Sequence, residues 1–387
     1  MRKRYRRAAV ALSAVALLAA ACDSSASGGG DSGSGPIRIA LMGIITGPSH
    51  LDGWDNSFKL AVDEINAAGG VLGRQIEYKE FDSGITPQAA ADATNLAVEY
   101  QPNLIIGYSV SAGLKASIPG INAAGVPVIH NTLAKLTSPD SLGSQLTFRL
   151  SPTGNQYATA SYQYLTQKAG ARSIALVNTQ DASPAEGAGE FQAEAAKGGV
   201  RVEHRAVSPT VTDLTEPVLA AKGSDALFVW GYNETDALAV KTAAANGYQG
   251  QYLGFNTAAA AQNNLIPAGL LTDKVHAMSF CPLEVLDTPA AQKYQQAYTA
   301  KYGVPPGNSS TSSYYDAVYI FKNVAEQIKS VDPGQIVAGL AKVDYQGACG
   351  EEKADAQHNL SHSVSILSFA GGKQKVDSTM NNLDAGF

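Results

Sequence analysis

The sequence predicts an α/β protein made of two lobes, each with a parallel β-sheet between layers of helices. Short apolar strands alternate with amphipathic helices from residue 37 onward, and the same rhythm restarts near residue 173. Strands that alternate with helices along the chain form parallel sheets covered on both faces. About 350 residues follow the N-terminal segment, which is too many for one small core and typical of two domains.

The first series of elements opens with a β-branched strand at 37–44, which Thr46-Gly47-Pro48 ends. A helix follows, because four apolar residues at i, i+3, i+4 and i+7 share one face. These residues are Phe58, Ala61, Val62 and Ile65. The pair Gly69-Gly70 is typical of a helix end. The other elements predicted in this series are strands at 76–81, 104–107 and 127–129, a helix at 87–100 and a helix from Ser111.

The second series repeats this alternation and points to the position of a binding site. Its predicted strands are 173–177, 201–207, 226–230 and 251–253, and its predicted helices are 187–197, 213–221 and 233–246. Open parallel sheets bind ligands outside the carboxyl ends of their strands. We therefore expect function in the loops that follow the strands: 43–54, 107–112, 130–133, 178–187, 231–234 and 254–257.

The N-terminus predicts export and lipid anchoring. Five cationic residues precede an uncharged, mostly apolar run at 8–21 that ends in small residues before Cys22. This order is typical of a secretory signal peptide, here 1–21. Small residues directly before a Cys resemble a bacterial lipobox, in which that Cys is acylated, although Ala19 stands where Leu is usual. An ordinary signal with an incidental Cys is the alternative. Residues 22–35, the lipidated Cys and a Ser/Gly/Asp-rich spacer, then form a flexible tether.

Charge and cysteine count narrow the class of protein. Removing the signal peptide takes the formal net charge from −6 to −11. A protein this acidic, without a stripe of Lys and Arg residues, is not expected to bind nucleic acid. No later stretch is long and apolar enough to span a bilayer. Besides Cys22, only Cys281 and Cys349 occur, and an oxidising exterior favours a disulfide between them over two separate buried thiols.

Catalytic and metal-binding motifs do not support an enzyme. The nearest approach to a nucleophile elbow, at 107–111, has Ser111 where a second Gly is required. No Walker A loop occurs, and Gly187-Ala188-Gly189 lacks the third Gly of a dinucleotide fingerprint. His358 and His362 are four residues apart, but without an HExxH pattern we predict a surface loop there. We expect no catalytic residue, no metal and no cofactor.

Several segments together resemble a known family. The clearest are 39–48 (IALMGIITGP) and 60–74 (LAVDEINAAGGVLGR). Shorter ones are Phe81-Asp82-Ser83, Ile105-Ile106-Gly107 with Ser111, Phe148-Arg149, Thr212-Asp213-Leu214-Thr215, Ala245-Asn246-Gly247-Tyr248 and Tyr315-Asp316-Ala317. In order and spacing, over nearly the whole mature chain, they resemble the leucine/isoleucine/valine-type branched-chain amino acid binding proteins of bacterial ABC importers.

The resemblance implies a type I periplasmic-binding-protein fold, in which three hinge strands join two Rossmann-like lobes. Hinge crossings are then expected near 148–152, 280–282 and 346–350, so Cys281 and Cys349 both lie at the hinge. The expected lobes are 36–150 with 283–346 and 151–282 with 347–387. The implied function is capture of a small polar solute (an amino acid or a related amide or aromatic acid) by hinge closure. The implied partner is an ABC permease, and we expect a monomer anchored to the outer face of the cell membrane.

The resemblance also implies binding residues. In such relatives, hydroxyls and backbone N–H groups of the first lobe hold a ligand carboxylate, and Ser111 and Thr132 stand in the matching loops. Hydroxyls beside helix N-termini suit an anion. Tyr232 matches a tyrosine of the second lobe, and Tyr108 and Ser109 complete the first-lobe set. The alternatives are a helix cap at Ser111, a turn at Thr132 and a rim aromatic at Tyr232.

Asn256 departs from the relatives that bind amino acids, which have a carboxylate in this loop for the ligand's ammonium group. An amide accepts a hydrogen bond but does not neutralise a buried charge. Either Glu186, Asp181 or Glu234 supplies the counter-charge, or the ligand is not an α-amino acid. Trp54, in the first loop, is expected to stack on a planar ligand or to pack on the lobe surface.

Two other functions stay open from sequence. A ligand-sensing receptor subunit could use the same fold to report to a signalling partner, and a sensor kinase encoded nearby would favour it. A permease and ATPases encoded nearby would favour transport. A secreted hydrolase would be supported by covalent labelling of Ser109 or Ser111 with an active-site probe.

Overall fold

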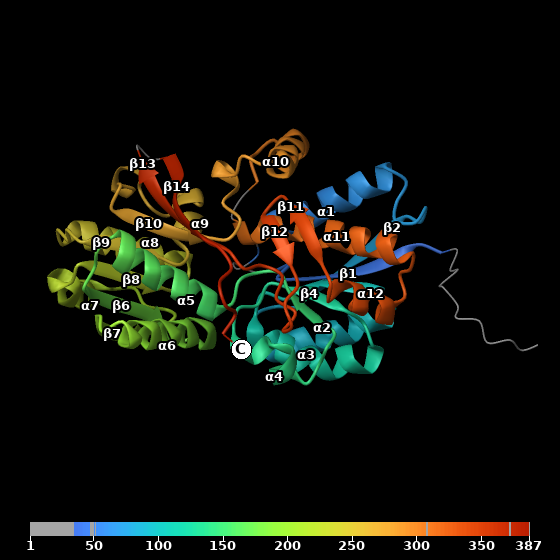
Figure 1. Ribbon diagram of the computed structural model, residues 1–387, viewed down its shortest axis with the longest axis horizontal. Coiled ribbons are helices and arrows are strands. Elements are labelled where there is room, and N and C mark those ends of the chain that lie inside the picture. Colours follow the sequence, from blue (N-terminus) through green and yellow to red (C-terminus); the bar gives the residue numbers. More distant parts are fainter. Residues whose placement is uncertain (1–34, 47–49, 51, 307–308, 371–372, 387) are drawn as a thin grey trace, which may run out of the picture.

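The computed structural model describes residues 35–46, 50, 52–306, 309–370 and 373–386. The predicted signal peptide, Cys22 and nearly all of the predicted tether lie outside these residues. The described chain forms two α/β lobes joined by segments that cross between them (Figure 1). In the part of the chain that the structure covers, no helix has both the length and the apolar character needed to cross a membrane.

A five-stranded parallel sheet with the order β2-β1-β3-β4-β5 is the centre of the first lobe. Its strands are β1 (Ile37–Gly43), β2 (Ile76–Asp82), β3 (Leu104–Gly107), β4 (Val128–His130) and β5 (Thr147–Arg149). One face is covered by α2 (Pro87–Glu99) and α3 (Ser111–Ala124), the other by α1 (Asp52–Ala67) and α11 (Ser309–Ile328). The other elements of this lobe are η1 (Lys135–Thr137), α4 (Pro139–Leu142), α10 (Pro289–Tyr302) and α12 (Pro333–Leu340).

The second lobe is built on a seven-stranded sheet with the order β14-β13-β10-β9-β8-β6-β7. Its strands are β6 (Ser173–Thr179), β7 (Arg201–Val207), β8 (Ala226–Trp230), β9 (Gln251–Gly254), β10 (Val275–Ser279), β13 (Val364–Ala370) and β14 (Lys373–Met380). The last two are antiparallel, and the others are parallel. Its helices are α5 (Gly154–Gln163), continued by η2 (Tyr164–Lys168), α6 (Ala182–Lys197), α7 (Thr215–Ala220), η3 (Ala221–Gly223), α8 (Asn233–Ala245), α9 (Thr257–Gln262), η4 (Ala268–Leu270) and η5 (Leu283–Val285).

Strand β1 shows why the sequence folds into layers. Side chains alternate across a strand, so a continuous apolar run buries both faces. Ile39 and Leu41 pack into the core on the α1 and α11 side, whereas Ala40 and Met42 pack on the α2 and α3 side. The larger of these apolar clusters continues through the hinge into the second lobe. The layered architecture therefore follows directly from the apolar strands recognised in the sequence.

The first and second crossings lie near the expected positions, and the third does not. Residues 346–350 form the turn of a hairpin, β11 (Asp344–Gly347) and β12 (Gly350–Lys353), and the crossing to β13 runs later, through 354–363. The Arg149 N–H donates to the carbonyl of His358, and the Leu360 N–H donates to the carbonyl of Arg149. The third crossing therefore runs beside the first.

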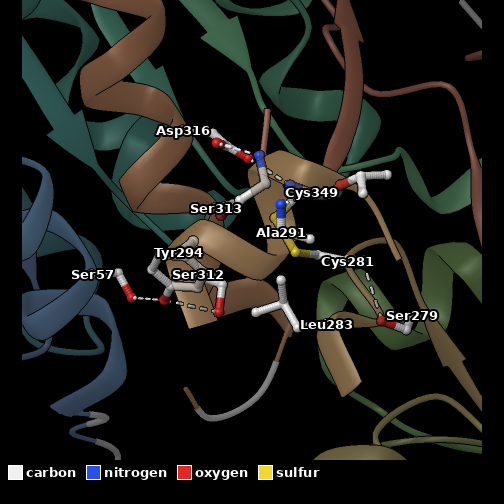
Figure 2. Close-up of a disulfide and its surroundings, with 12 residues drawn as sticks. Ser57, Ser279, Cys281, Leu283, Ala291, Tyr294, Ser312, Ser313, Asp316 and Cys349 are labelled. Carbon is white, nitrogen blue, oxygen red and sulfur yellow. Dashed lines mark hydrogen bonds between the residues drawn. A yellow bond between two sulfur atoms is a disulfide. The ribbon is translucent and has the colours of Figure 1, made fainter. Parts of the chain in front are cut away.

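A buried carboxylate is the physical reason for the hairpin. Asp316 accepts hydrogen bonds from the N–H groups of Ala348 and Cys349, both at 2.8 Å (Figure 2). A Cβ at Gly347 would lie 2.5 Å from the Asp316 Cγ, so glycine lets the turn approach the carboxylate. In the structure, Cys349 forms a disulfide with Cys281, which follows β10. The bond ties the second crossing to the hairpin.

Two smaller predictions also differ from the structure. Helix α6 begins at Ala182, five residues before the predicted start, since Pro184 fits in the first turn of a helix and does not interrupt it. The surface loop predicted at His358 is wrong. That imidazole is buried and stacks on Phe148, with ring centroids 4.3 Å apart.

Candidate functional site

The loops at the carboxyl ends of the parallel strands of the two sheets are joined across the lobes. The N–H of Lys135, in the loop after β4, donates to the carboxylate of Glu186 on α6 of the second lobe. Glu186, considered as a counter-charge for a ligand, thus has a partner on the first lobe. We define the candidate site as the loops 43–54, 107–112, 130–137, 178–187, 231–234 and 254–257 together with the side chains that back them.

Ser111 joins two loops of the first lobe. It occupies the first turn of α3, whose N-cap is Val110 and makes no side-chain cap hydrogen bond. The Ser111 Oγ accepts a long hydrogen bond, 3.4 Å, from the N–H of Ala134. The helix-cap alternative for Ser111 is therefore not what the structure shows. The start of α3 keeps backbone N–H groups without a side-chain cap, beside a hydroxyl.

Thr132 lies inside its loop. It is fully buried, and its Oγ1 is 2.9 Å from the Nδ1 of His130 and 2.8 Å from the Oγ1 of Thr137. Arg149 donates to the carbonyl of Leu133 at 2.7 Å and to the Thr137 Oγ1 at 3.1 Å, which fixes the loop from behind. Burial, with the nearby guanidinium of Arg149, lowers the pKa of His130 well below its usual value. These contacts favour the alternative reading of Thr132 as a turn residue.

At the end of β3, the side chains of Tyr108 and Ser109 have different surroundings. Gly107 has φ +143°, and a Cβ there would lie 1.9 Å from the carbonyl oxygen of Met42, so only glycine fits. The turn sends the Tyr108 ring into the core, where its hydroxyl is 2.6 Å from the Thr94 Oγ1. Burial raises the pKa of Tyr108 to about 12. The Tyr108 side chain is thus separated from the candidate site, whereas Ser109 is partly exposed beside it.

Trp54 stacks on Tyr314, a residue of α11 that sequence reasoning did not select. The ring centroids are 5.8 Å apart, with an interplanar angle of 25°. The Trp54 Nε1 and the Tyr314 hydroxyl are both buried without a hydrogen-bond partner among the described residues. Such groups are rare and suit a polar partner supplied by a ligand. The only sequence signal for Tyr314 is its place next to the Tyr315-Asp316-Ala317 match.

Tyr232 and Asn256 come from neighbouring loops of the second lobe. Tyr232 is the N-cap residue of α8 and is 46% exposed. Burial, followed by the charge of Asp181, raises its pKa. The Asn256 Nδ2 donates to the carbonyl of Gly231 at 2.7 Å. Because that carbonyl only accepts, the amide must point its NH₂ group there and keep its Oδ1 for another donor.

Glu190 lies one helical turn after Glu186 and faces the same contact between the lobes. One of its carboxylate oxygens is buried without a hydrogen-bond partner in the described chain. Burial, and then the charge of Glu186, raise the pKa of Glu190 to about 7, while Lys135 and Arg149 oppose this. Two surface hollows of about 600 and 690 Å³ lie elsewhere and are lined by none of the predicted site residues.

Two α/β lobes whose strand-end loops meet define a class of protein that holds a small ligand between lobes. The chain belongs to the periplasmic binding protein family, whose family model matches residues 36–374, and it is therefore an extracytoplasmic solute-binding protein. It resembles the branched-chain amino acid binding proteins of ABC transporters. The fold is the type I fold of that family.

Three relatives illustrate the match. A Leu/Ile/Val-binding protein homolog 8 of Brucella melitensis is 26% identical over 80% of this chain and 81% of its own. The structure of LivJ from Streptococcus pneumoniae in complex with isoleucine matches with a TM-score of 0.76 and 24% identity. The match covers 89% of this chain and 99% of LivJ. The structure of a solute-binding protein of R. palustris in complex with 4-hydroxybenzoate matches with a TM-score of 0.78 and 20% identity. This match covers 91% of this chain and 98% of the R. palustris protein.

Proposed function

We propose that this protein captures a small carboxylic acid between its lobes and delivers it to the permease of an ABC importer, without chemical turnover. The observation that carries the proposal is the hydrogen bond from Lys135 to Glu186, which brings together the strand-end loops of both sheets. Ligand contacts on both lobes would stabilise the closed form by their differential affinity. Isoleucine and 4-hydroxybenzoate, found in the two structural relatives, both carry a carboxylate.

The first lobe supplies the carboxylate end of this site. Helix α3 begins without a side-chain cap, and the Ser111 hydroxyl stands in its first turn. Backbone N–H groups at a helix start favour an anion. We assign Ser111 and the start of α3 to the ligand's carboxylate. Ser109 lies just before them and is partly exposed.

The second lobe and the aromatic pair define the other end of the ligand. Asn256 offers an acceptor without a charge, so an ammonium group there would lack a counter-ion. Trp54 and Tyr314 form a buried, stacked aromatic pair whose polar atoms lack partners in the described chain. We therefore propose a ligand with an uncharged donor, such as a hydroxylated aromatic acid, with Tyr232 at the rim.

A ligand panel tests this proposal. Thermal shift and calorimetry with 4-hydroxybenzoate, benzoate, leucine and isoleucine should show stabilisation by an aromatic acid, because a ligand that binds only the folded state raises its stability. Asn256→Asp should improve isoleucine affinity at least tenfold by pairing its ammonium. Asn246→Asp is the matched control, since Asn246 caps the far end of α8. Micromolar binding of isoleucine to the wild type, with no aromatic acid bound, would refute the proposed ligand class.

The N-terminus completes the proposal with an anchor. We propose that Cys22 carries a lipid at the outer face of the membrane. Residues 23–35 would then tether the two lobes beside the permease. In that case Cys22→Ser should release the exported protein from the membrane fraction. Mass mapping of an unacylated Cys22 in membrane-bound wild type would contradict the anchor.

A further inference from the structure

A carboxylic acid is buried behind Asn256 without a cation. Asp236 lies in the first turn of α8 and has no exposed surface. The shift in the pKa of Asp236 has no contribution from a Lys, Arg or His of the described chain, and its Oδ1 has no hydrogen-bond partner there. Burial raises the pKa of Asp236 well above its usual value, only partly opposed by hydrogen bonds from Thr257 and Asn256. These features disfavour the ionised form of Asp236.

The other oxygen of Asp236 holds the loop that carries Asn256. Its Oδ2 accepts the N–H of Asn256 at 2.7 Å and the hydroxyl of Thr257 at 3.0 Å. A Cβ at Gly254 would lie 2.5 Å from this oxygen and 2.0 Å from the Thr257 Oγ1. Because residue 254 is glycine, the loop can pack directly against Asp236. The loop after β9 is thus fixed from beneath by a residue of α8.

The same network reaches the loop after β8. The Asn256 side chain donates to the carbonyl of Gly231, directly before Tyr232, and α8 begins at the next residue. Asp236 therefore closes a ring of contacts from α8 to the loop after β9 and back to the loop after β8. In this ring both the position of the Asn256 backbone and the orientation of its amide are determined.

We propose that Asp236 is a positioning residue which, through its contacts with the Asn256 N–H and the Thr257 hydroxyl, fixes Asn256 with its Oδ1 turned toward the ligand. Asp236 does not touch the ligand and acts through Asn256. The inference rests on the proposed function only in giving Asn256 a ligand contact. The positioning itself is a property of the free protein, so it is measured without any ligand.

Hydrogen exchange of the free protein is the first test. Asp236→Asn keeps the shape of the neutral acid and an oxygen that accepts from Asn256, so it should preserve protection of the Asn256 amide. Asp236→Ala removes that acceptor and should speed exchange at Asn256 about tenfold or more. Thr94→Ala, which disturbs a buried hydrogen bond in the first lobe, is the control and should leave Asn256 unchanged. If Asp236→Ala does not fold, Asp236→Ser, whose hydroxyl is too short to reach, serves in its place.

Calorimetry with 4-hydroxybenzoate is the second test. Affinity should fall about tenfold in Asp236→Ala, recover in Asp236→Asn and stay unchanged in Thr94→Ala. Unchanged Asn256 exchange in Asp236→Ala, or loss of protection in Asp236→Asn, would overturn the positioning role. Altered exchange together with no binding of 4-hydroxybenzoate by the wild type would support the positioning role and count against the proposed ligand class alone.

Discussion

At the scale of single residues, two hydroxyls that look equivalent in sequence have different surroundings. The Ser111 hydroxyl has one long hydrogen bond, from Ala134, at the start of α3. The Thr132 hydroxyl is fully buried between His130 and Thr137. A hydroxyl with a weak partner at a helix start is available to a ligand, whereas one enclosed by its own loop supports that loop.

We therefore expect opposite effects from removing the two hydroxyls. Ser111→Ala should weaken ligand binding about tenfold and leave unfolding unchanged, because it removes a ligand contact and hardly any internal one. Thr132→Ala should lower the free energy of unfolding by about 1–2 kcal/mol, because it leaves buried groups without a partner. Calorimetry and urea unfolding measure the two effects. Equal affinity in Ser111→Ala and wild type would remove Ser111 from the site.

The surroundings of three residues in or near the site could not be predicted from the sequence. Loop position suggested Tyr108, but the φ of +63° imposed after Gly107 turns its ring into the core. Tyr314 was missed because it lies on a helix more than 250 residues after Trp54, with which it stacks. Asp236 was missed because a buried acid and an exposed acid look alike in sequence. Side-chain direction and long-range contact are set by tertiary structure, which no local pattern encodes.

At the scale of elements, the hairpin β11–β12 depends on one acid and one disulfide. Burial raises the pKa of Asp316 to about 6, although the N–H groups of Cys349 and Ala348 stabilise its charged form. The disulfide joins Cys349 of the turn to Cys281, 68 residues earlier. The bond therefore closes a long loop that includes α10, α11 and α12.

Replacing both cysteines tests this role. Cys281→Ser with Cys349→Ser should reduce the free energy of unfolding by about 3 kcal/mol, because the disulfide restricts the unfolded chain. Ligand affinity should change little, since neither cysteine lies in the candidate site loops. Denaturant unfolding without reductant measures the loss. A double variant as stable as the wild type would show that Asp316 and packing hold the hairpin alone.

Periodicity predicted most elements because it reflects burial directly. Strands β3, β7 and β8 have the predicted bounds, since each is a short run between clear turn signals. The third crossing was misplaced because the turn at Gly347–Gly350 is set by Asp316, 31 residues before Gly347 in sequence. Local signals thus predict elements better than they predict the connections between them.

At the scale of the whole molecule, the contact between the lobes should respond to pH. Glu190 faces Glu186 on its own helix and Lys135 and Arg149 of the first lobe, and its pKa is raised from 4.5 to about 7. A raised pKa means that this arrangement binds a proton more tightly than a solvated carboxyl does. We attribute the shift to burial of Glu190 at the contact between the lobes, which outweighs the attraction of Lys135 and Arg149. The lobe contact should then be favoured at low pH and weakened as pH rises through about 7.

Small-angle scattering of the ligand-free protein tests this expectation. The radius of gyration should be smaller at pH 5.5 than at pH 8, and Glu190→Gln, which mimics the neutral acid, should flatten the difference. Ligand affinity should follow the same trend, with a change of about fivefold. An identical pH response in Glu190→Gln would assign the effect to another group.

The interleaving of the lobes along the chain sets an order of assembly. The first lobe needs α10 to α12, from residues 289–340, and the sheet of the second lobe ends with β13 and β14 at residues 364–380. Neither lobe can be completed until almost the whole polypeptide is available. If the predicted signal peptide exports the chain unfolded, we expect the C-terminal strands to be the last elements to join the fold, on the far side of the membrane.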